Sequence, residues 1–202
     1  MKTYLRPSAA VSSEILIRHS RFICYISPVS GRAEAEAFIN SIRRQHPKAN
    51  HNCWSYVAGY PEDPLQWNCS DDGEPKGTAG QPMLNILRHS GMGQICAVVT
   101  RYFGGVKLGT GGLVRAYGQS LNESIKLLET EAVVPQADIA LRAGYDLTGD
   151  LEQLISRFSI DVEERLFEDQ LIIRGRIEAH QLDDLRQALQ PIQHKVTLSC
   201  DD

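Results

Sequence analysis

Hydrophobic and polar positions repeat along this chain with two periods, which predict a mixture of helices and strands. Apolar residues three or four positions apart predict helices within 30–47, 78–91, 113–130, 148–159 and 179–190. Alternating or continuous apolar runs predict strands within 14–29, 51–60, 93–103, 136–146, 160–179 and 192–200. The run 93–103 is nearly all apolar, which favours a central strand buried on both faces. The segment 61–77 contains three prolines and is predicted to be a loop.

This pattern changes near Pro135, where a long predicted helix gives way to a strand. The charge changes sign at the same place. Residues 1–135 carry 14 Lys and Arg against 11 Asp and Glu, and residues 136–202 carry 7 against 14. We therefore expect an α+β protein of two domains, 1–135 and 136–202. The second has the βαββαβ order of a ferredoxin-like domain, which indicates no particular chemistry.

The composition is that of a folded globular protein, with 42% apolar and 23% charged residues. No apolar run approaches the roughly 20 residues that span a bilayer, and the first residues lack the pattern of a secretory signal. We therefore expect a cytoplasmic protein. The five cysteines are odd in number and form no C-x-x-C pair, which favours reduced thiols. His51 and Cys53 resemble half of a metal site, but no second pair is evident, so we expect no metal and no cofactor.

One segment combines glycine, positive charge and a strand followed by a helix. Residues 75–122 contain no Asp or Glu, and 11 of the 16 glycines lie within 73–118. The free N–H groups at a helix N-terminus attract anions, and glycines let an anion approach the backbone. The expected helix begins at Leu113, directly after the glycines. This pattern predicts an anion or nucleic-acid site formed by Lys76, Arg101, Gly104, Gly105, Lys107, Gly109, Thr110, Gly111, Gly112 and Arg115.

An ordinary structural role for the same segment stays open. The glycines can shape a tight crossover while the cations are simply solvated on the surface. The segment matches neither a Walker loop nor a dinucleotide fingerprint, and residues 118–122 do not form a nucleophile elbow. The absence of acids over 48 residues exceeds what a turn requires, so anion binding is the better interpretation.

A second group of polar residues, "SDDGEP", lies at 70–75. Asp71, Asp72 and Glu74 are suitable ligands for Mg²⁺ and suitable acid–base groups. A solvated turn with Asx capping is the more ordinary interpretation. A third possibility is that Asp72 or Glu74 pairs with Arg101 or Arg115 and fixes the shape of the glycine segment.

Residues next to this turn add two smaller expectations. Thr78 is the predicted N-cap of the helix within 78–91. Trp54, Tyr56 and Trp67 lie near the turn in sequence, where a nucleobase can stack on one of them, although core packing is the more common role.

Two blocks carry a resemblance to a known family: "SDDGEPKGTAGQPML" followed by "VVTRYFGGVKLGTGGLVRAY". They resemble the signature of the IMPACT family, and the whole chain is similar to its bacterial, YigZ-type members. The resemblance implies a first domain like the second domain of a small-subunit ribosomal protein, a fold shared with translational GTPases and RNase PH. It implies a second domain like the last domain of elongation factor G. It also implies a shared surface over 71–80 and 101–117, with no catalytic residue to transfer.

Charge and resemblance together predict a non-enzymatic, translation-associated regulator. It would bind RNA, or a ribosomal or translation-factor surface, through the glycine-rich basic face of the first domain, and would not enter a membrane. The alternative is an enzyme or binding protein for a small phosphorylated substrate, using the acids of "SDDGEP" beside the glycines. A site for a protein partner alone is the third possibility.

Overall fold

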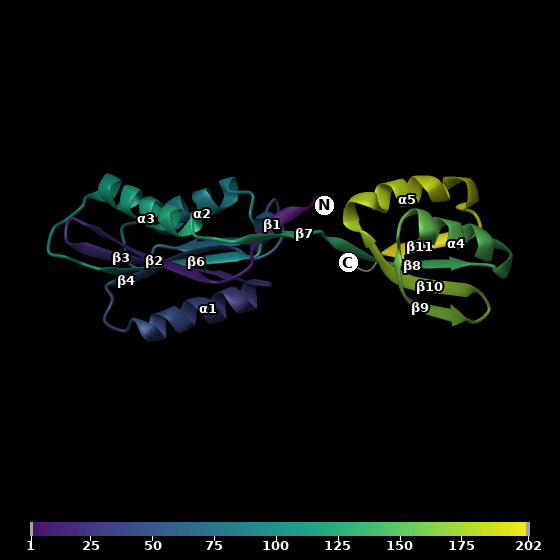
Figure 1. Ribbon diagram of the computed structural model, residues 1–202, viewed down its shortest axis with the longest axis horizontal. Helices are drawn as coiled ribbons and strands as arrows, with labels where there is room; N and C mark the ends of the chain where they lie inside the picture. Colours follow the sequence, from purple (N-terminus) through teal and green to yellow (C-terminus); the bar gives the residue numbers. More distant parts are fainter. Residues whose placement is uncertain (1, 201–202) are drawn as a thin grey trace. The chain divides into compact units, whose positions relative to one another are not determined.

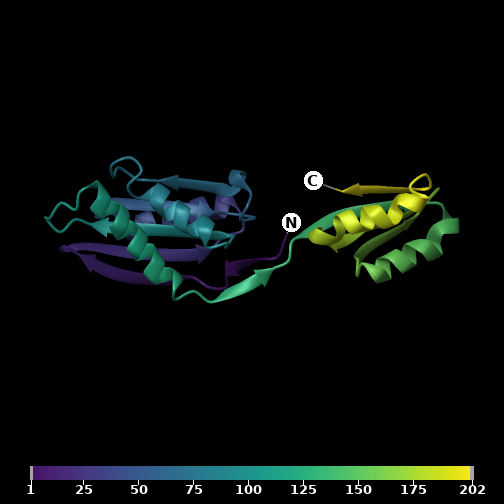
Figure 2. The same ribbon diagram turned by 90° about the horizontal axis from the view of Figure 1, so that it is seen from above.

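The structure is a computed structural model that describes residues 2–200. Its contacts divide the chain into two compact units, one of Tyr4–Val133 and the other formed, among the described residues, by 2–3 and 134–200. Each unit has its own sheet and its own helices (Figures 1 and 2). The mixture of helices with antiparallel sheets makes this an α+β protein, as predicted.

The first unit is built on a five-stranded sheet with β6 (Ile95–Tyr102) in the middle. The strand order is β2 (Val11–Ile17), β3 (Ser20–Pro28), β6, β4 (His51–Val57) and β5 (Trp67–Ser70). Every neighbouring pair is antiparallel. All of β6 except Tyr102 is buried, because its continuous apolar run faces helices on both sides of the sheet. A separate antiparallel pair is formed by β1 (Tyr4–Pro7) and β7 (Thr130–Val133).

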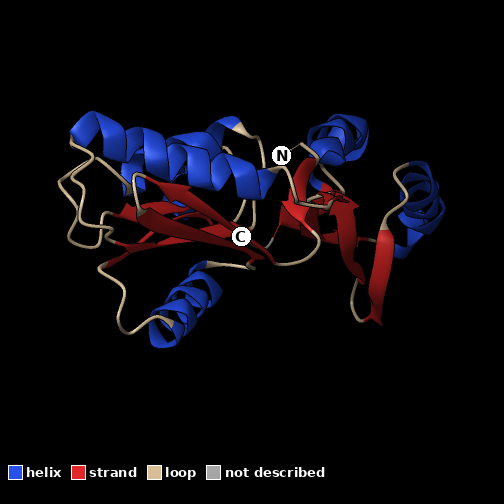
Figure 3. Cartoon of the chain, turned by 60° about the vertical axis from the view of Figure 1, so that its left-hand side comes forward, coloured by secondary structure: helices blue, strands red, loops and turns tan. Residues whose placement is uncertain are grey.

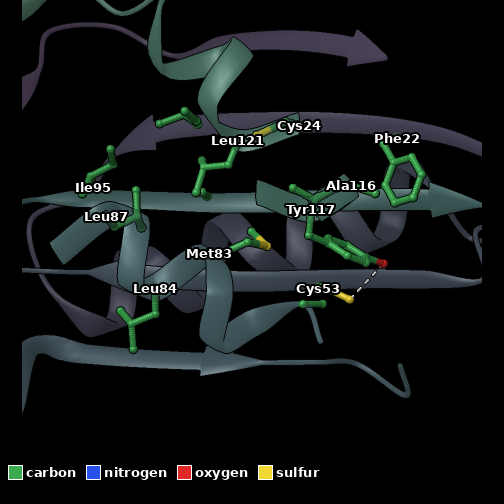
Figure 4. Close-up of a cluster of buried hydrophobic side chains, with 14 of the residues drawn as sticks. Phe22, Cys24, Cys53, Met83, Leu84, Leu87, Ile95, Ala116, Tyr117 and Leu121 are labelled. Carbon is green, nitrogen blue, oxygen red and sulfur yellow. Dashed lines mark hydrogen bonds between the residues drawn. The ribbon is translucent and has the colours of Figure 1, made fainter. Parts of the chain in front are cut away.

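Helices cover both faces of this sheet (Figure 1). Helices α2 (Gly80–His89) and α3 (Thr110–Ile125) lie on one face, and α1 (Arg32–Gln45) lies on the other. Under α2 and α3, the side chains of Met83, Leu87 and Leu121 pack with Phe22 of the sheet (Figure 4). Alternation along β6 supplies both layers, since Val99 belongs to this core while its neighbour Val98 packs under α1.

The second unit has the element order β8 (Gln136–Ala143), α4 (Thr148–Arg157), β9 (Asp161–Phe167), β10 (Leu171–Glu178), α5 (Leu182–Leu189) and β11 (Val196–Cys200). Its sheet order is β11-β8-β10-β9, antiparallel throughout. One buried cluster joins Leu151 of α4, Leu185 of α5 and Leu141 and Ile173 of the sheet. The helices and the sheet therefore share a single core. Figure 3 shows the helices and strands in separate colours.

Several local features differ from the sequence prediction. The helix expected within 113–130 ends at Ile125, and Thr130 begins strand β7. The segment 61–77 is not all loop, because it contains a short 3₁₀ turn, Pro64–Gln66, and strand β5, which pairs with β4. Helix α3 begins at Thr110 and not at Leu113, so two of the glycines form part of its first turn. Thr78 does not cap α2, because its hydroxyl donates to the carbonyl of Pro75. In the described chain, no helix is both long enough and apolar enough to cross a membrane.

Candidate functional site

Asp71, in the acidic turn (residues 70–75), closes the N-terminus of α2. Its Oδ1 accepts hydrogen bonds from the backbone N–H groups of Ala79 (2.9 Å) and Gly80 (2.8 Å), and its Oδ2 accepts from Gly77 (2.7 Å). Burial alone would raise the pKa of Asp71, but the three N–H bonds outweigh it and lower that pKa below its usual value. Asp71 therefore performs the capping that the sequence assigned to Thr78.

Asp72 ties the acidic turn to two other elements. Its Oδ1 accepts from Nη2 of Arg43 on α1 at 2.7 Å, and its Oδ2 accepts from the backbone N–H of Asn52 on β4 at 2.7 Å. The φ angle of Asp72 is 44°, a left-handed conformation that these contacts hold in place. Over residues 2–200, no group of three or more His, Cys, Asp or Glu side chains is placed to hold a metal ion. The carboxylates of Asp71 and Asp72 are thus engaged in shaping the turn.

Glu74 forms a buried ion pair with Arg101. Nη1 of Arg101 donates to Oε1 of Glu74 at 2.6 Å, and both side chains are less than a tenth exposed, at 7% and 4%. The hydroxyl of Tyr117, on α3, donates to the same oxygen at 2.8 Å. Arg101 is therefore not a free cation on the surface. The sequence left open whether an acid of the turn pairs with an arginine of the glycine segment. The Glu74–Arg101 ion pair is such a contact.

The hydrogen bonds around Glu74 continue through Tyr117 to Cys53 in the core, and these two side chains are uncharged. The Cys53 thiol lies 3.3 Å from the Tyr117 hydroxyl (Figure 4). Burial raises the pKa of Tyr117 and of Cys53 far above their usual values. Neither group ionises near neutral pH, so Glu74 and Arg101 carry the charges of this cluster.

His51, at the start of β4, completes the polar group around Glu74. Its Nδ1 lies 2.9 Å from the backbone carbonyl of Asp72, and its Nε2 lies 3.8 Å from Oε2 of Glu74. From the sequence, His51 was expected only as half of a metal site. His51 lies two residues before the buried Cys53, so both side chains lie on the same face of β4. This spacing was the sequence signal that could have placed His51 beside the buried polar group.

A cavity of about 430 Å³ opens beside the Glu74–Arg101 pair. We call it the α3 cavity, because the start of α3 forms one of its walls. Its other walls come from the start of β4, the acidic turn and the residues that follow β6. The lining residues are Asn50, His51, Glu74, Pro75, Arg101, Phe103, Lys107, Leu108, Gly109, Thr110 and Leu113.

The first turn of α3 lies at this cavity with its N–H groups open. Gly109 is the N-cap, with φ of 71°, and among the described residues no side chain caps the helix and no acid lies in its first turn. The first intrahelical bond is from Leu113 N–H to the Gly109 carbonyl at 2.9 Å. The N–H groups of Thr110, Gly111 and Gly112 precede it and are free to bind an anion.

The glycine loop (residues 104–112) contains glycines with different roles. A Cβ on Gly104 would collide with the backbone of His19, so Gly104 is required by close packing of two chain segments. Gly105 and Gly109 have positive φ angles of 86° and 71°. A Cβ on Gly111 would meet nothing within 4 Å. Gly104 and Gly105 therefore shape the loop, whereas Gly111 belongs to the open helix N-terminus.

The predicted cations are distributed over several places. Lys107 lines the α3 cavity, and Arg115 lines a neighbouring hollow of about 230 Å³ together with Arg18 and Gly112. Lys76 is exposed on the acidic-turn side of the unit. Arg18, Lys107 and Arg115 are all exposed, and none forms an ion pair with any residue that the structure describes. We call these three residues the outer basic surface.

Sequence reasoning missed Arg18 and the apolar part of the cavity. Arg18 lies in the tight turn between β2 and β3, and only the sheet order brings that turn beside α3. The aromatic side chain at the cavity is Phe103, which is 45% exposed. Trp67 lies instead under the guanidinium of Arg88, at 4.1 Å. The three aromatics suggested for base stacking, Trp54, Tyr56 and Trp67, are all outside the cavity lining.

Comparisons with known proteins identify the family of this chain. The profile of the Impact N-terminal domain matches residues 18–125. An IMPACT family member of Haemophilus influenzae is 46% identical over 80% of this chain and 79% of its own length. The IMPACT family member YigZ of Escherichia coli is 45% identical over 78% of this chain and 77% of its own. The crystal structure of a hypothetical protein superimposes with a TM-score of 0.73 at 36% identity, covering 100% of this chain and 98% of the other. The acidic turn and the glycine loop, which together build the α3 cavity, both lie within the matched domain, and the chain belongs to the IMPACT family as a YigZ-type member.

Proposed function

We propose that this protein is a non-enzymatic regulator associated with translation in the cytoplasm. It binds RNA, free or as part of the ribosome, through the outer basic surface and the open N-terminus of α3. The observation that carries the proposal is the combination of three exposed cations without ion-pair partners in the described chain and an uncapped helix N-terminus beside them. Phosphate groups satisfy both features at once.

The charge distribution supports this surface as the binding face. Residues 75–122 carry no acid, so no carboxylate from this segment repels an approaching phosphate. The chain from 136 onward carries twice as many acids as bases, and this negative charge disfavours contact with RNA phosphates. A contact with only a few cations gives modest affinity that falls as salt rises.

Family membership and fold add further support. The resemblance to the IMPACT family implies a role in translation, because eukaryotic members of the family act as regulators of translation. The family has no known catalytic residue. We infer that the first unit shares the fold of the second domain of a small-subunit ribosomal protein, because β3, α1 and β4 form a βαβ crossover around β6. We infer that the second unit is ferredoxin-like, because its sheet order is β11-β8-β10-β9.

Fluorescence anisotropy with a labelled single-stranded RNA at several salt concentrations tests the proposal. Three phosphate contacts predict a slope of about −2 for log affinity against log salt, at about 0.7 per contact. Arg115→Glu is expected to weaken binding and to reduce the magnitude of the slope by about 0.7. Arg44→Glu is the matched control, because Arg44 is exposed on α1, on the opposite face of the same sheet. Equal effects of the two variants, or no binding at low salt, would eliminate the proposal.

A second candidate function, binding or conversion of a small phosphorylated molecule, is favoured by the α3 cavity itself. Of the three acids in the acidic turn, only Glu74 lines this cavity. A thermal-shift panel of nucleotides and phosphorylated metabolites, with and without Mg²⁺, distinguishes the two candidates. A ligand-dependent rise in melting temperature in the absence of RNA binding would favour the small molecule.

A further inference from the structure

We propose that the α3 cavity holds one unpaired nucleotide of the bound RNA, with its base inside the cavity and its phosphodiester at the first turn of α3. This inference rests on the proposed function and specifies its ligand as single-stranded RNA. It assigns the cavity a role separate from that of Arg18 and Arg115, which contact phosphates outside it.

The apolar wall of the cavity is suited to a planar base. Phe103 is 45% exposed at the cavity, and Leu108 and Leu113 line the same space. The guanidinium carbon of Arg101 lies 5.6 Å from the centre of the Phe103 ring. An exposed aromatic ring beside a guanidinium is the usual platform for an unstacked nucleobase. The volume of about 430 Å³ lies in the ordinary range for a small-molecule site.

Two charged residues that line the cavity, Arg101 and Glu74, have incomplete hydrogen bonding. Arg101 is 7% exposed, and its Nε is buried with no hydrogen-bond partner among the described residues. The hydrogen bonds that the described residues donate to Glu74 go to its Oε1, while its Oε2 lies 3.8 Å from Nε2 of His51. A buried N–H without an acceptor is costly. The edge of a nucleobase presents both acceptors and donors, which suits a lining that contains a guanidinium and a carboxylate.

The charge at the cavity fits one phosphodiester. Among its lining residues Lys107 and Arg101 are positive and Glu74 is negative, which leaves one net positive charge. A phosphodiester carries one negative charge, and the N–H groups of Thr110 and Gly111 at the N-terminus of α3 are free to receive its oxygens. Lys107 also lines the cavity and supplies the positive charge for this phosphate.

A base paired within a duplex cannot enter a cavity of this kind, because its faces are stacked and its edge is occupied. The cavity therefore gives single-stranded RNA a higher affinity than duplex RNA. The outer basic surface alone does not discriminate between single-stranded and duplex RNA, because both carry phosphates. This contrast separates the two proposals experimentally.

Anisotropy titrations of a single-stranded RNA and its duplex, at one low salt concentration, test the inference. We expect the wild-type protein to bind the single strand about tenfold more tightly, as loss of one base stacked on an aromatic ring typically costs that much or more. Phe103→Ala is expected to remove this preference and to leave duplex affinity unchanged. Val106→Ala is the matched control, because Val106 is 40% exposed in the same loop and lies outside the cavity lining.

A single strand in which the bases are replaced by abasic sites should bind the wild-type protein as weakly as the intact strand binds Phe103→Ala. A thermal melt of each variant shows whether it is folded. Equal affinity of the wild-type protein for single strand and duplex, or equal effects of Phe103→Ala and Val106→Ala, would overturn the inference while RNA binding that depends on Arg115 survives. Loss of all RNA binding would overturn both proposals. Saturable binding of free nucleoside monophosphate, detected by thermal shift in the absence of any RNA binding, would identify a free nucleotide as the ligand and also overturn the inference.

Discussion

Helices α2 and α3 lie on the same face of the same sheet, yet their N-termini are treated in opposite ways (Figure 1). The α2 N-terminus is closed by Asp71, whose carboxylate accepts from Gly77, Ala79 and Gly80. The α3 N-terminus begins after Gly109 and has no capping side chain in the described part of the chain. The fold thus supplies a capping carboxylate to the N-terminus of α2, whereas no described carboxylate caps the N-terminus of α3.

The charges around the two helix starts show the same difference. Near α2, Asp71, Asp72 and Glu74 are each bound by backbone N–H groups or by arginine. Near α3, Lys107 and Arg115 are exposed and no described residue pairs with them. We infer that the acidic turn is a structural device and that the start of α3 is the binding element.

The largest expected effect comes from the ion pair that joins the two regions, because Glu74 belongs to the acidic turn and Arg101 leads into the glycine loop. Glu74→Gln leaves the buried guanidinium of Arg101 without a counter-charge. We expect a loss of about 3–5 kcal/mol in the free energy of unfolding, measured by urea denaturation. The double variant Glu74→Gln with Arg101→Met should recover part of this loss. Additive losses in the double variant would show that the two side chains are not coupled.

Removal of the α2 cap has the next largest expected effect. Asp71→Ala leaves the N–H groups of Ala79 and Gly80 without their acceptor and should cost about 2 kcal/mol. Urea denaturation measures this cost. Thr78→Val, which removes only a hydroxyl bonded to the Pro75 carbonyl, is the control that should cost less. A larger loss in Thr78→Val would return the capping role to Thr78.

The same cap gives a pH dependence with a definite sign. The pKa of Asp71 is lower in the folded chain than its ordinary value of 3.8. Its contribution to stability is therefore complete above about pH 5 and is lost as the pH falls through 3.8 toward the lower folded value. The difference in unfolding free energy between wild type and Asp71→Ala should shrink between pH 5 and pH 2. A constant difference over this interval would mean that the carboxylate charge does not matter.

A change at the start of α3 should affect binding and leave stability nearly unchanged. Thr110 is the first residue of α3, where proline is tolerated, and the ψ of 166° at Gly109 is compatible with a following proline. Thr110→Pro removes one N–H from the open helix start and is expected to weaken RNA binding about fivefold in anisotropy titrations, or about 1 kcal/mol. Thr110→Ala keeps that N–H and should bind like wild type. Equal weakening in both variants would assign the effect to the hydroxyl.

The smallest expected effect is a gain in stability. A Cβ at Gly111 meets nothing within 4 Å, so Gly111→Ala should stabilise α3 by about 0.5–1 kcal/mol in urea denaturation. Gly104→Ala is the contrasting variant, because its Cβ would collide with the His19 backbone. A destabilised Gly111→Ala protein would show that the start of α3 is more crowded than the structure indicates.

Sequence periodicity predicted most of the elements because their apolar faces are long and regular. It placed the buried run of β6 correctly, since a strand covered on both faces leaves a continuous apolar signal. It missed β5, because four residues rich in polar side chains carry no period, and only pairing with β4 makes them a strand. It began α3 three residues late, because glycine is a poor helix former and the pattern of Gly111 and Gly112 reads as a loop.

The candidate site was predictable in part. The unusual glycine and charge content marked the glycine loop, and the acids marked the turn beside it. Local sequence does not reveal which side chains are consumed by internal contacts, so Arg101 was assigned to the surface although Glu74 holds it in the interior. The same limit concealed Arg18 and His51, which reach the site through the sheet order and not through sequence proximity.

The central claim is that open N–H groups at the start of α3 receive RNA phosphate, whereas the capped groups at the start of α2 do not. Titration of single-stranded RNA into ¹⁵N-labelled protein, followed by the amide resonances of the glycines, tests this directly. We expect saturable shifts at Gly111 and Gly112 and little change at Gly77 and Gly80, which Asp71 already binds. RNA that binds without moving Gly111 and Gly112, or that moves Gly77 and Gly80 equally, would contradict the claim.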